Sequence, residues 1–257
     1  MDLLVAYKED PAGRNMAGHF MESMEEDGGV YRGSSYDLAV IDSPAVSADW
    51  LESRFSYDGY VFLSRHAAES GRLALTCHST GNFGRAMLGG NDMQVAVPYA
   101  SLQKSYMRRL WAHRREFGDF EITLETTHHG PTALDRPSIF VEVGTTESQW
   151  NDAGLCRAVA AILDEALSET EEYPLAIGFG GSHYPGPFTR EVVDGEYSLG
   201  TIIPRRDLGE VDKGMLSHVI SRNHGARAAM LDWDGLGGHR RRILDLLEGT
   251  DLEVVRV

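Results

Sequence analysis

The chain is poor in cysteine and lacks long apolar runs. Cys77 and Cys156 are the only thiols among 257 residues, which excludes a disulfide framework and makes a reducing cytoplasm the expected compartment. No stretch approaches the run of about 18–20 apolar residues that spans a bilayer. Lys8, Glu9 and Asp10 follow closely on the first residues, which argues against a secretory signal. We therefore expect a cytoplasmic protein without a membrane segment.

Lysine is scarce as well. Only three of the 24 basic residues are lysines, against 39 acidic residues, and the net charge is −15. An acidic chain that keeps arginine favours a halophilic protein, because carboxylates hold hydration and salt screens their repulsion. An ordinary acidic enzyme from a GC-rich genome is the alternative. The acidity argues against nucleic acid, although high salt weakens that inference, and we expect no DNA partner.

Several common catalytic motifs are absent. The sequence contains no Walker A motif, no GxGxxG fingerprint, no GxSxG elbow and no HExxH zinc motif, so the usual nucleotide, serine-hydrolase and compact zinc sites are unsupported. Cys77 precedes His78, but neighbours in a strand point to opposite faces. A buried cysteine is therefore favoured over a Cys-His nucleophile pair.

Short apolar runs alternate with helical periodicities along the whole chain. This alternation, without a linker rich in Pro or Ser, predicts a single domain over residues 1–257. Its fold class is α/β, three-layer αβα, with one mixed, mostly parallel sheet covered on both faces. The expected strands are 3–7, 36–42, 59–64, 73–78, 121–127, 138–143, 175–179, 196–203, 226–231 and 252–257. One expected helix starts at Asp10 and Pro11. The others cover 99–115, 147–167, 212–222 and 238–248.

Histidines gather where these elements end. His78 and the pair His128-His129 close predicted strands, His183 follows another, and His224 follows a helix. Small polar residues come after each of them. Because open α/β sheets bind ligands outside the carboxyl ends of their strands, we expect a shared crevice.

The residue types in this crevice indicate hydrolytic chemistry. Imidazoles and carboxylates are the ligands of a catalytic zinc that keeps one position open for water. Without a metal, one histidine would act as a general base and another would stabilise an oxyanion. A hydrogen-bonded structural role stays open for any single histidine. The candidate metal ligands are His78, His128, His129, Glu142 and His183, and the candidate catalytic residues are His128, His129, Glu142 and Glu147.

Six motifs together resemble the archaeal and plant type of D-aminoacyl-tRNA deacylase. They are KEDPAGRN (8–15), CHSTGN (77–82), TTHHGP (126–131), EVGTTESQW (142–150), GFGGSHYPGPFT (178–189) and SRNHG (221–225). The resemblance covers nearly the whole chain. It implies a fold like that of phosphorylase and peptidyl-tRNA hydrolase domains. It also implies zinc-dependent cleavage of the ester that joins a D-amino acid to the 3′ end of tRNA, and it leaves the ligand set open.

Substrate recognition follows from the same resemblance. A terminal adenosine needs small residues for close backbone approach, and the tRNA body needs arginines. The arginine clusters are 108–109, 114–115, 205–206 and 240–242. The candidate substrate-binding residues are His78, Thr145, Thr146, Gly181, Ser182, Arg205 and His224.

Two other functions remain open at this point. One is a metal-dependent hydrolase of a small peptide or N-acyl amino acid, which would gain nothing from tRNA. The other is a module that binds nucleotides or tRNA ends without turnover, which the cluster of histidines disfavours. We expect a monomer or a small homo-oligomer.

Overall fold

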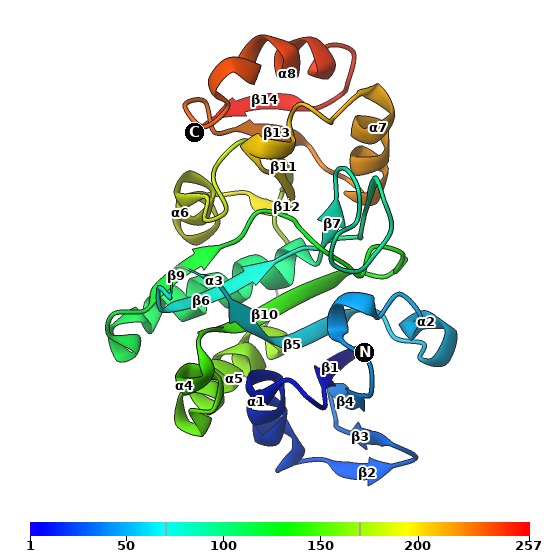
Figure 1. The fold of residues 1–257 in the computed structure, drawn as a ribbon, viewed down its shortest axis with the longest axis vertical. Helices are drawn as coiled ribbons and strands as arrows, with labels where there is room; N and C mark the ends of the chain where they lie inside the picture. Colours follow the sequence, from blue (N-terminus) through cyan, green and yellow to red (C-terminus); the bar gives the residue numbers. More distant parts are fainter. Residues whose placement is uncertain (70, 170) are drawn as a thin grey trace.

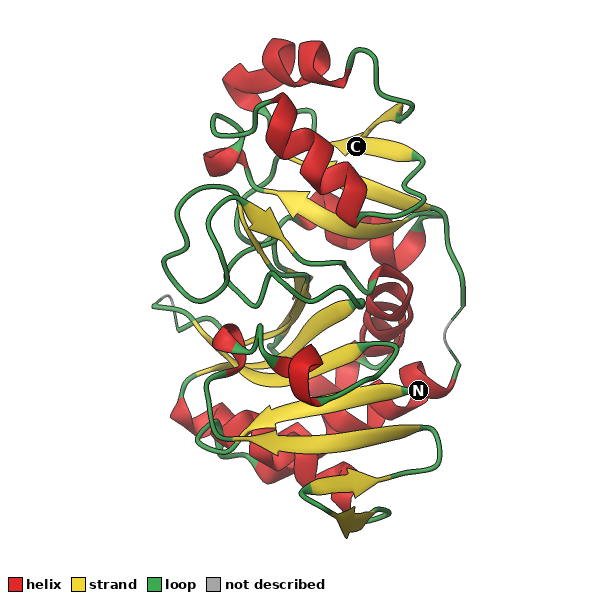
Figure 2. Cartoon of the chain, turned by 90° about the vertical axis from the view of Figure 1, so that its right-hand side faces the viewer, coloured by secondary structure: helices red, strands yellow, loops and turns green. Residues whose placement is uncertain are grey.

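The chain builds two main β-sheets, which lie one above the other in Figure 1. The computed structural model describes residues 1–69, 71–169 and 171–257. The larger sheet has eight strands in the order β2-β3-β4-β1-β5-β10-β6-β9, and the smaller has four in the order β12-β11-β13-β14. Figure 2 shows loops gathered between the two sheets on one side of the molecule. Among the described residues, no helix combines the length and apolar character that a membrane span requires.

The larger sheet is mixed. Strands β4, β1, β5 and β10 run parallel, β6 is antiparallel to β10, and β9 is parallel to β6. Its strands are β1 (Asp2–Tyr7), β2 (Glu25–Asp27), β3 (Val30–Arg32), β4 (Tyr36–Ile41), β5 (Tyr60–Ala67), β6 (Ala74–His78), β9 (Glu121–Leu124) and β10 (Ser138–Thr145). A separate hairpin joins β7 (Gly81–Asn82) to β8 (Gln94–Val95).

The smaller sheet is entirely parallel. Its strands are β11 (Leu175–Phe179), β12 (Ser198–Ile203), β13 (Ala228–Leu231) and β14 (Glu253–Arg256). The α/β class and the mixed, mostly parallel pairing are thus confirmed, whereas the expectation of one sheet is wrong. Periodicity identifies strands but not the strands with which they pair. The strands that follow β10 in the chain pair only with one another and form the smaller sheet.

The helices pack against both sheets. They are α1 (Pro11–Met21), α2 (Leu51–Arg54), α3 (Ala100–Ala112), α4 (Glu147–Trp150), α5 (Ala153–Ser168), α6 (Gly186–Asp194), α7 (Lys213–Arg222) and α8 (Arg240–Leu247), with short 3-10 turns η1 (Ala45–Ser47), η2 (Arg114–Phe117), η3 (Arg205–Asp207) and η4 (Gly237–His239). The expected helix 147–167 is two helices, because Asp152 caps a new one by accepting a hydrogen bond from Leu155 N. The predicted start of α1 is confirmed, with Asp10 as N-cap and Pro11 in the first turn.

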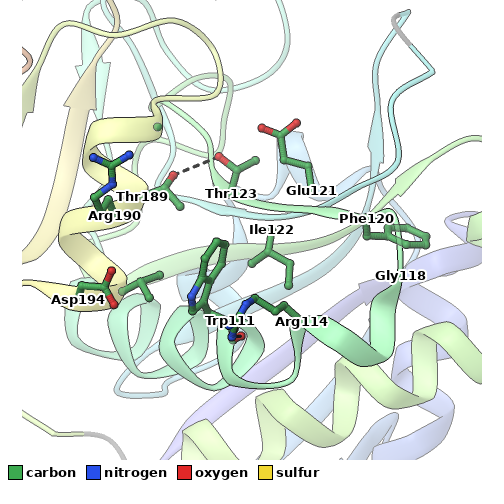
Figure 3. A pocket seen from close by; sticks show the side chains of 12 residues that line it. Trp111, Arg114, Gly118, Phe120, Glu121, Ile122, Thr123, Thr189, Arg190 and Asp194 are labelled. Atoms are coloured by element: carbon green, nitrogen blue, oxygen red, sulfur yellow. Dashed lines mark hydrogen bonds between the residues drawn. The ribbon is translucent and has the colours of Figure 1, made fainter.

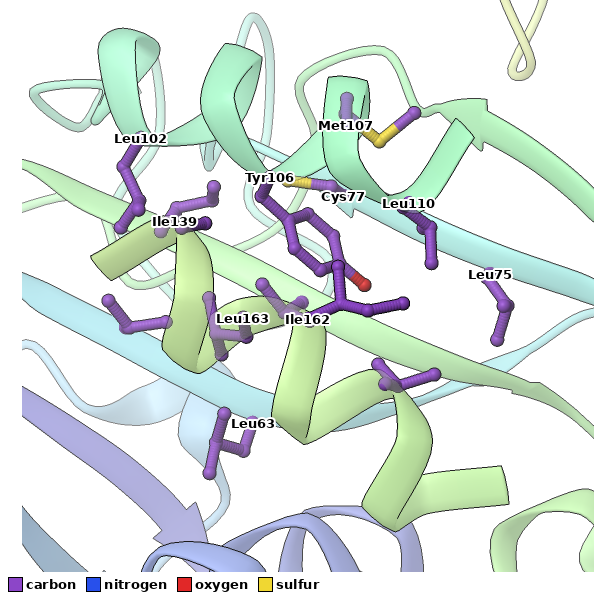
Figure 4. Packing of buried hydrophobic residues seen from close by; sticks show 14 of the residues in the cluster. Leu63, Leu75, Cys77, Leu102, Tyr106, Met107, Leu110, Ile139, Ile162 and Leu163 are labelled. Atoms are coloured by element: carbon purple, nitrogen blue, oxygen red, sulfur yellow. The ribbon is translucent and has the colours of Figure 1, made fainter. Parts of the chain in front are cut away.

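One face of the larger sheet carries the main core. Tyr106 of α3 and Leu163 of α5 pack there against Leu63 and Ile139 of the central strands (Figure 4). Fully burying a side chain of this size contributes about 1.5–3 kcal/mol. The opposite face has a smaller core, in which Phe62 stacks on Phe140 at 4.6 Å beneath η1 and α2. Among the described residues, no long helix belongs to this second core, which leaves room for the site.

Candidate active site

The site lies over the second face of the larger sheet, beside the Phe62–Phe140 stack. Phe140 of β10 pairs with His78 of β6, so the two side chains share a face, and their rings stack at 5.3 Å. Glu142, two residues further along β10, projects from the same face. The sequence placed these groups at one edge of the sheet. Because β6 runs antiparallel to β10, its carboxyl end instead reaches the middle of β10.

Residues 125–129 bring the next groups in and tie the two sheets together. Backbone N–H groups of Thr126 and Thr127 donate to His183 O at 3.0 Å and to Ile202 O at 2.9 Å, both on the smaller sheet's side. His129 adopts a left-handed backbone conformation with φ of 41°, which is uncommon for a residue with a side chain. Its carbonyl accepts from Gly81 N at 2.8 Å, which helps to hold this conformation.

His78, His128 and His129 form a group that we call the histidine triad. Each Nδ1 donates to a backbone carbonyl: Ser79 O at 3.1 Å, Thr126 O at 2.8 Å and Gly130 O at 2.7 Å. In a neutral ring these bonds place the proton on Nδ1 and the lone pair on Nε2. The ring centroids lie 4.2–4.8 Å apart. The triad therefore presents three orientated acceptor nitrogens.

Glu125 and Glu142 form a carboxylate pair beside the triad. His66 Nδ1 lies 2.9 Å from Glu125 Oε1 and 3.4 Å from Glu142 Oε2. His183 Nε2 lies 2.8 Å from Glu125 Oε2. His66 Nε2 in turn contacts the hydroxyl of Tyr184 at 2.6 Å. The contacts of the triad with these carboxylates are longer: His78 Nε2 lies 3.8 Å from Glu142 Oε1, and His128 Nε2 lies 3.6 Å from Glu125 Oε2.

Burial and charge set the protonation of these groups. Burial alone would lower the pKa of His66, but hydrogen bonds to Glu125 and Glu142 outweigh it and raise that pKa to about 10. Burial and the neighbouring His78 lower the pKa of His129 to about 4. Although burial opposes it, contacts with the histidines keep the pKa of each carboxylate below its usual value. Neutral His129 and two ionised carboxylates form an environment that attracts a cation.

The donor set fits a metal ion. One ring nitrogen from each triad histidine lies within 4.8 Å of the other two, and Glu125, His128 and His183 form a second such group. His78 Nε2 is buried and forms no hydrogen bond within the described part of the chain, and both buried oxygens of Glu125 lie against histidine nitrogens. A buried polar atom without a partner is costly, so a cation here would satisfy His78 Nε2. These residues could therefore hold a metal ion.

The group opens into a cleft of about 820 Å³, lined by residues that include His66, Glu125, Glu142 and Arg206. A neighbouring cavity of about 610 Å³ shares His183 and Arg206 with the cleft, and it contains Gly181, Ser182 and Arg205. His128 and His129 also line a third, smaller cavity. The predicted residues Gly181, Ser182 and Arg205 thus lie next to the site.

The structure does not bring the remaining predicted residues to the cluster. Glu147 and Thr146 are exposed at the start of α4, where Thr146 caps the helix. Thr145 is buried, and its hydroxyl donates to Arg72 O. His224 is exposed and lines a different cavity beside Tyr99. His224 was predicted in the crevice because a polar loop follows it, as one follows the strand-end histidines. It follows a helix instead, and the end of that helix lies at a different cavity.

Sequence reasoning missed His66, Glu125 and Tyr184. Glu125 lies within the predicted strand 121–127, three residues before His128. His66 follows two residues after the predicted third strand, in the position that a histidine takes after the other strands. The pattern that selected the other histidines could therefore have found His66.

A further pocket of about 530 Å³ lies between the end of α3, β9 and α6 (Figure 3). Arg114 lines it and stacks on Trp111 at 5.2 Å. Arg109 is ion-paired to Glu169 at 2.9 Å. This pocket contains none of the site histidines. The arginines at the end of α3 therefore lie outside the cleft.

The fold and the cleft define an α/β protein with a buried histidine–carboxylate site. Residues 53–255 match the family model described as D-aminoacyl-tRNA deacylase. The chain is 58% identical to a D-aminoacyl-tRNA deacylase of Cenarchaeum symbiosum over 99% of both chains. It is 30% identical to one of Thermoplasma acidophilum over the full length of both. The chain belongs to the D-aminoacyl-tRNA deacylase family.

A solved structure has the same fold. The crystal structure of AF0625, described as a conserved protein of unknown function, superposes with a TM-score of 0.93 at 25% sequence identity. The match covers 100% of this chain and 95% of that one. The division into two sheets is therefore shared with an experimentally determined relative.

Proposed function

We propose that the chain hydrolyses the ester of D-aminoacyl-tRNA and releases free tRNA and a D-amino acid. Family membership supports the substrate, and the histidine triad beside the carboxylate pair supports the chemistry. The observation that carries the chemistry is the triad itself, because each Nδ1 donates to a backbone carbonyl and one ring nitrogen of each histidine lies within 4.8 Å of the other two. The cytoplasm, where tRNA is used, is the proposed compartment, and residues 1–257 act as one domain.

Zinc is the proposed cofactor. Held by Nε2 of His78, His128 and His129, it would polarise the ester carbonyl and supply an activated water near neutral pH. Two ionised carboxylates close by favour a divalent cation there. Three histidines are a ligand set that catalytic zinc uses while it keeps a position for water.

Glu142 is the proposed general base. Its contacts with His66 Nδ1 and Thr76 Oγ1 are both 3.4 Å, and His78 Nε2 lies 3.8 Å away. These contacts are long, and the ionised carboxylate lines the cleft, where it can accept a hydrogen bond from the attacking water. Glu142 takes the proton of the attacking water and returns it to the departing ribose oxygen. Glu125 is held by His66 and His183 and serves as a positioning residue.

The test is deacylation of matched D- and L-tyrosyl-tRNA in high-salt buffer, before and after treatment with a chelator and return of zinc. High salt suits the acidic composition. We expect loss of the D ester alone, abolished by the chelator and restored by zinc. Cleavage of neither ester by folded protein would contradict the function. Cleavage that survives complete metal removal would retain the function but refute zinc.

A small-molecule substrate is the alternative. Equal rates on a D-tyrosyl ester with and without a tRNA body would favour it. The neighbouring 610 Å³ cavity argues for the larger substrate, since a peptide or N-acyl amino acid would leave it empty.

A further inference from the structure

The 610 Å³ cavity lies at the carboxyl ends of three parallel strands of the smaller sheet. Gly181 and Ser182 follow β11, Arg205 and Arg206 follow β12, and Asp232 follows β13. In parallel sheets this end is where ligands bind. Its lining includes a carboxylate, two guanidinium groups and glycine backbone, and these groups limit the kind of ligand that can bind.

Asp232 supplies a buried carboxylate at the cavity wall. Its residue is 7% exposed, and Oδ1 accepts from Gly235 N at 2.9 Å. Oδ2 accepts no hydrogen bond from residues 1–69, 71–169 and 171–257, and it is not among the fully buried unpaired atoms. It is therefore accessible at the wall of the cavity, where an ionised carboxylate oxygen can accept a hydrogen bond from a ligand.

A backbone donor lies beside that oxygen. A Cβ at position 235 would lie 2.0 Å from Asp232 Oδ2 and 2.8 Å from Gly181 N. Only glycine fits at 235, and the two polar atoms face the same small space. Gly181 has φ of 85°, and its N–H donates to no atom in the described part of the chain. The wall therefore presents an acceptor next to a donor.

Two arginines provide positive charge in the same cavity. The Arg205 guanidinium packs against Gly237, where a Cβ would lie 2.5 Å from Nη2. Within the described residues Arg205 forms no ion pair, and Arg206 reaches only Asp207, at 3.5 Å. Arginines without a strong acidic partner are notable in a chain of net charge −15. They are suited to bind a phosphate.

We propose that this cavity binds a nucleotide of the tRNA 3′ end. The amino group and ring nitrogen that adenine and cytosine share would donate to Asp232 and accept from Gly181 N–H, and the phosphate would bind Arg205 and Arg206. Every tRNA ends in CCA, so both bases are present. The inference rests on the proposed function, and it makes the smaller sheet the recognition element for a substrate cleaved over the larger one.

The position of the cavity agrees with this role. His183 and Arg206 line both the cavity and the 820 Å³ cleft. A nucleotide held there lies directly beside the histidine–carboxylate group. The ribose of that nucleotide, or the next nucleotide of the tRNA, would then extend into the cleft.

The experiment measures binding of a fluorescently labelled CCA trinucleotide to the full chain by anisotropy. Asp232→Asn retains the acceptor for Gly235 but removes the charge, and we expect its Kd to rise at least tenfold. Arg205→Ala should weaken binding and flatten its dependence on salt, because one phosphate contact is lost. The matched control is Asp234→Asn, which removes the same charge from an exposed side chain of the same loop and should bind as the wild type does.

Each outcome decides the proposal. Equal Kd values for the wild type and both cavity variants would overturn it, as would no binding by the wild type at millimolar trinucleotide. A labelled UUU trinucleotide that binds as tightly as CCA would refute reading of the shared edge. Arg205 is exposed, so its variant is informative even if Asp232→Asn does not fold. A wild type that binds CCA but spares D-tyrosyl-tRNA would refute the proposed function and leave this cavity standing.

Discussion

The two sheets contribute different kinds of residue to neighbouring parts of one cleft. The larger sheet supplies Glu142, His78 and His66, which are at most 5% exposed. The smaller sheet supplies Arg205 and Arg206, which are exposed, and loops rich in glycine. Buried titratable groups suit chemistry, because a low dielectric strengthens their interactions. Exposed arginines suit recognition of a charged polymer. The comparison supports the proposal that catalysis and recognition are divided between the sheets.

The strongest way to break this division is to remove one triad nitrogen. His129→Ala should lose zinc and nearly all turnover of D-tyrosyl-tRNA, because the proposed zinc site needs all three histidines. Turnover and zinc content by atomic absorption are the readouts. His224→Ala is the matched control, since His224 lies in a different cavity, and it should retain both. Near-normal turnover of His129→Ala would place the chemistry elsewhere.

Lys104 tests whether the sheets must be held together. This fully buried residue of α3 donates from Nζ to Gly195 O at 2.7 Å and Tyr197 O at 2.9 Å, near the start of β12. Lys104→Met leaves these carbonyls without a donor, and the free energy of unfolding should fall by about 3 kcal/mol. Urea denaturation measures the loss. The exposed Lys213→Met should change stability little, and an equal effect of both variants would count against the contact.

The same residue gives a pH dependence. Burial lowers the pKa of Lys104 to about 8 from 10.5. Between these values the unfolded chain binds the proton and the folded chain does not, so stability rises with pH. The stability difference between the wild type and Lys104→Met should therefore grow from pH 8 to pH 10. A constant difference over this range would show that the ammonium is not desolvated.

Tyr184 makes a single contact between the two sheets, and its removal should have a smaller effect on stability. Its loop follows β11 of the smaller sheet, and its hydroxyl contacts His66 of β5 at 2.6 Å. Tyr184→Phe removes this hydrogen bond, and stability should fall by about 1 kcal/mol. Thermal unfolding of the variant measures it. Tyr31→Phe is the control, because the Tyr31 hydroxyl forms no hydrogen bond among the described residues. If the two variants melt alike, the contact between sheets contributes nothing.

Much of this arrangement could be predicted from the sequence, and the remainder has physical causes. Apolar runs and the cap at Asp10 indicated the strands and α1, and the position of His78, His128 and His129 after strands indicated a cluster. The direction of β6 could not be read, because periodicity does not encode pairing. Helix α6 was missed, since its first residues Gly186 and Pro187 are typical of a turn.

The glutamates of the site were the hardest residues to predict from the sequence. Glu147 was predicted at the start of a helix near the histidine pair; the helix start is confirmed, but the side chain is exposed and lies outside the cluster. Glu125 was passed over because a glutamate in a threonine-rich strand resembles a solvent-facing residue. Only the contact between residues 125–129 and the smaller sheet buries it. That contact joins distant parts of the chain, so no local pattern reveals it.

The most direct test of the division compares Glu142→Gln with Asp232→Asn on D-tyrosyl-tRNA, with kcat and KM measured separately. Glu142→Gln should lower kcat by about 100-fold or more with little change in KM. Asp232→Asn should raise KM and leave kcat near the wild-type value. If both variants lower kcat at unchanged KM, the smaller sheet takes part in the chemistry, and the division between catalysis and recognition is wrong.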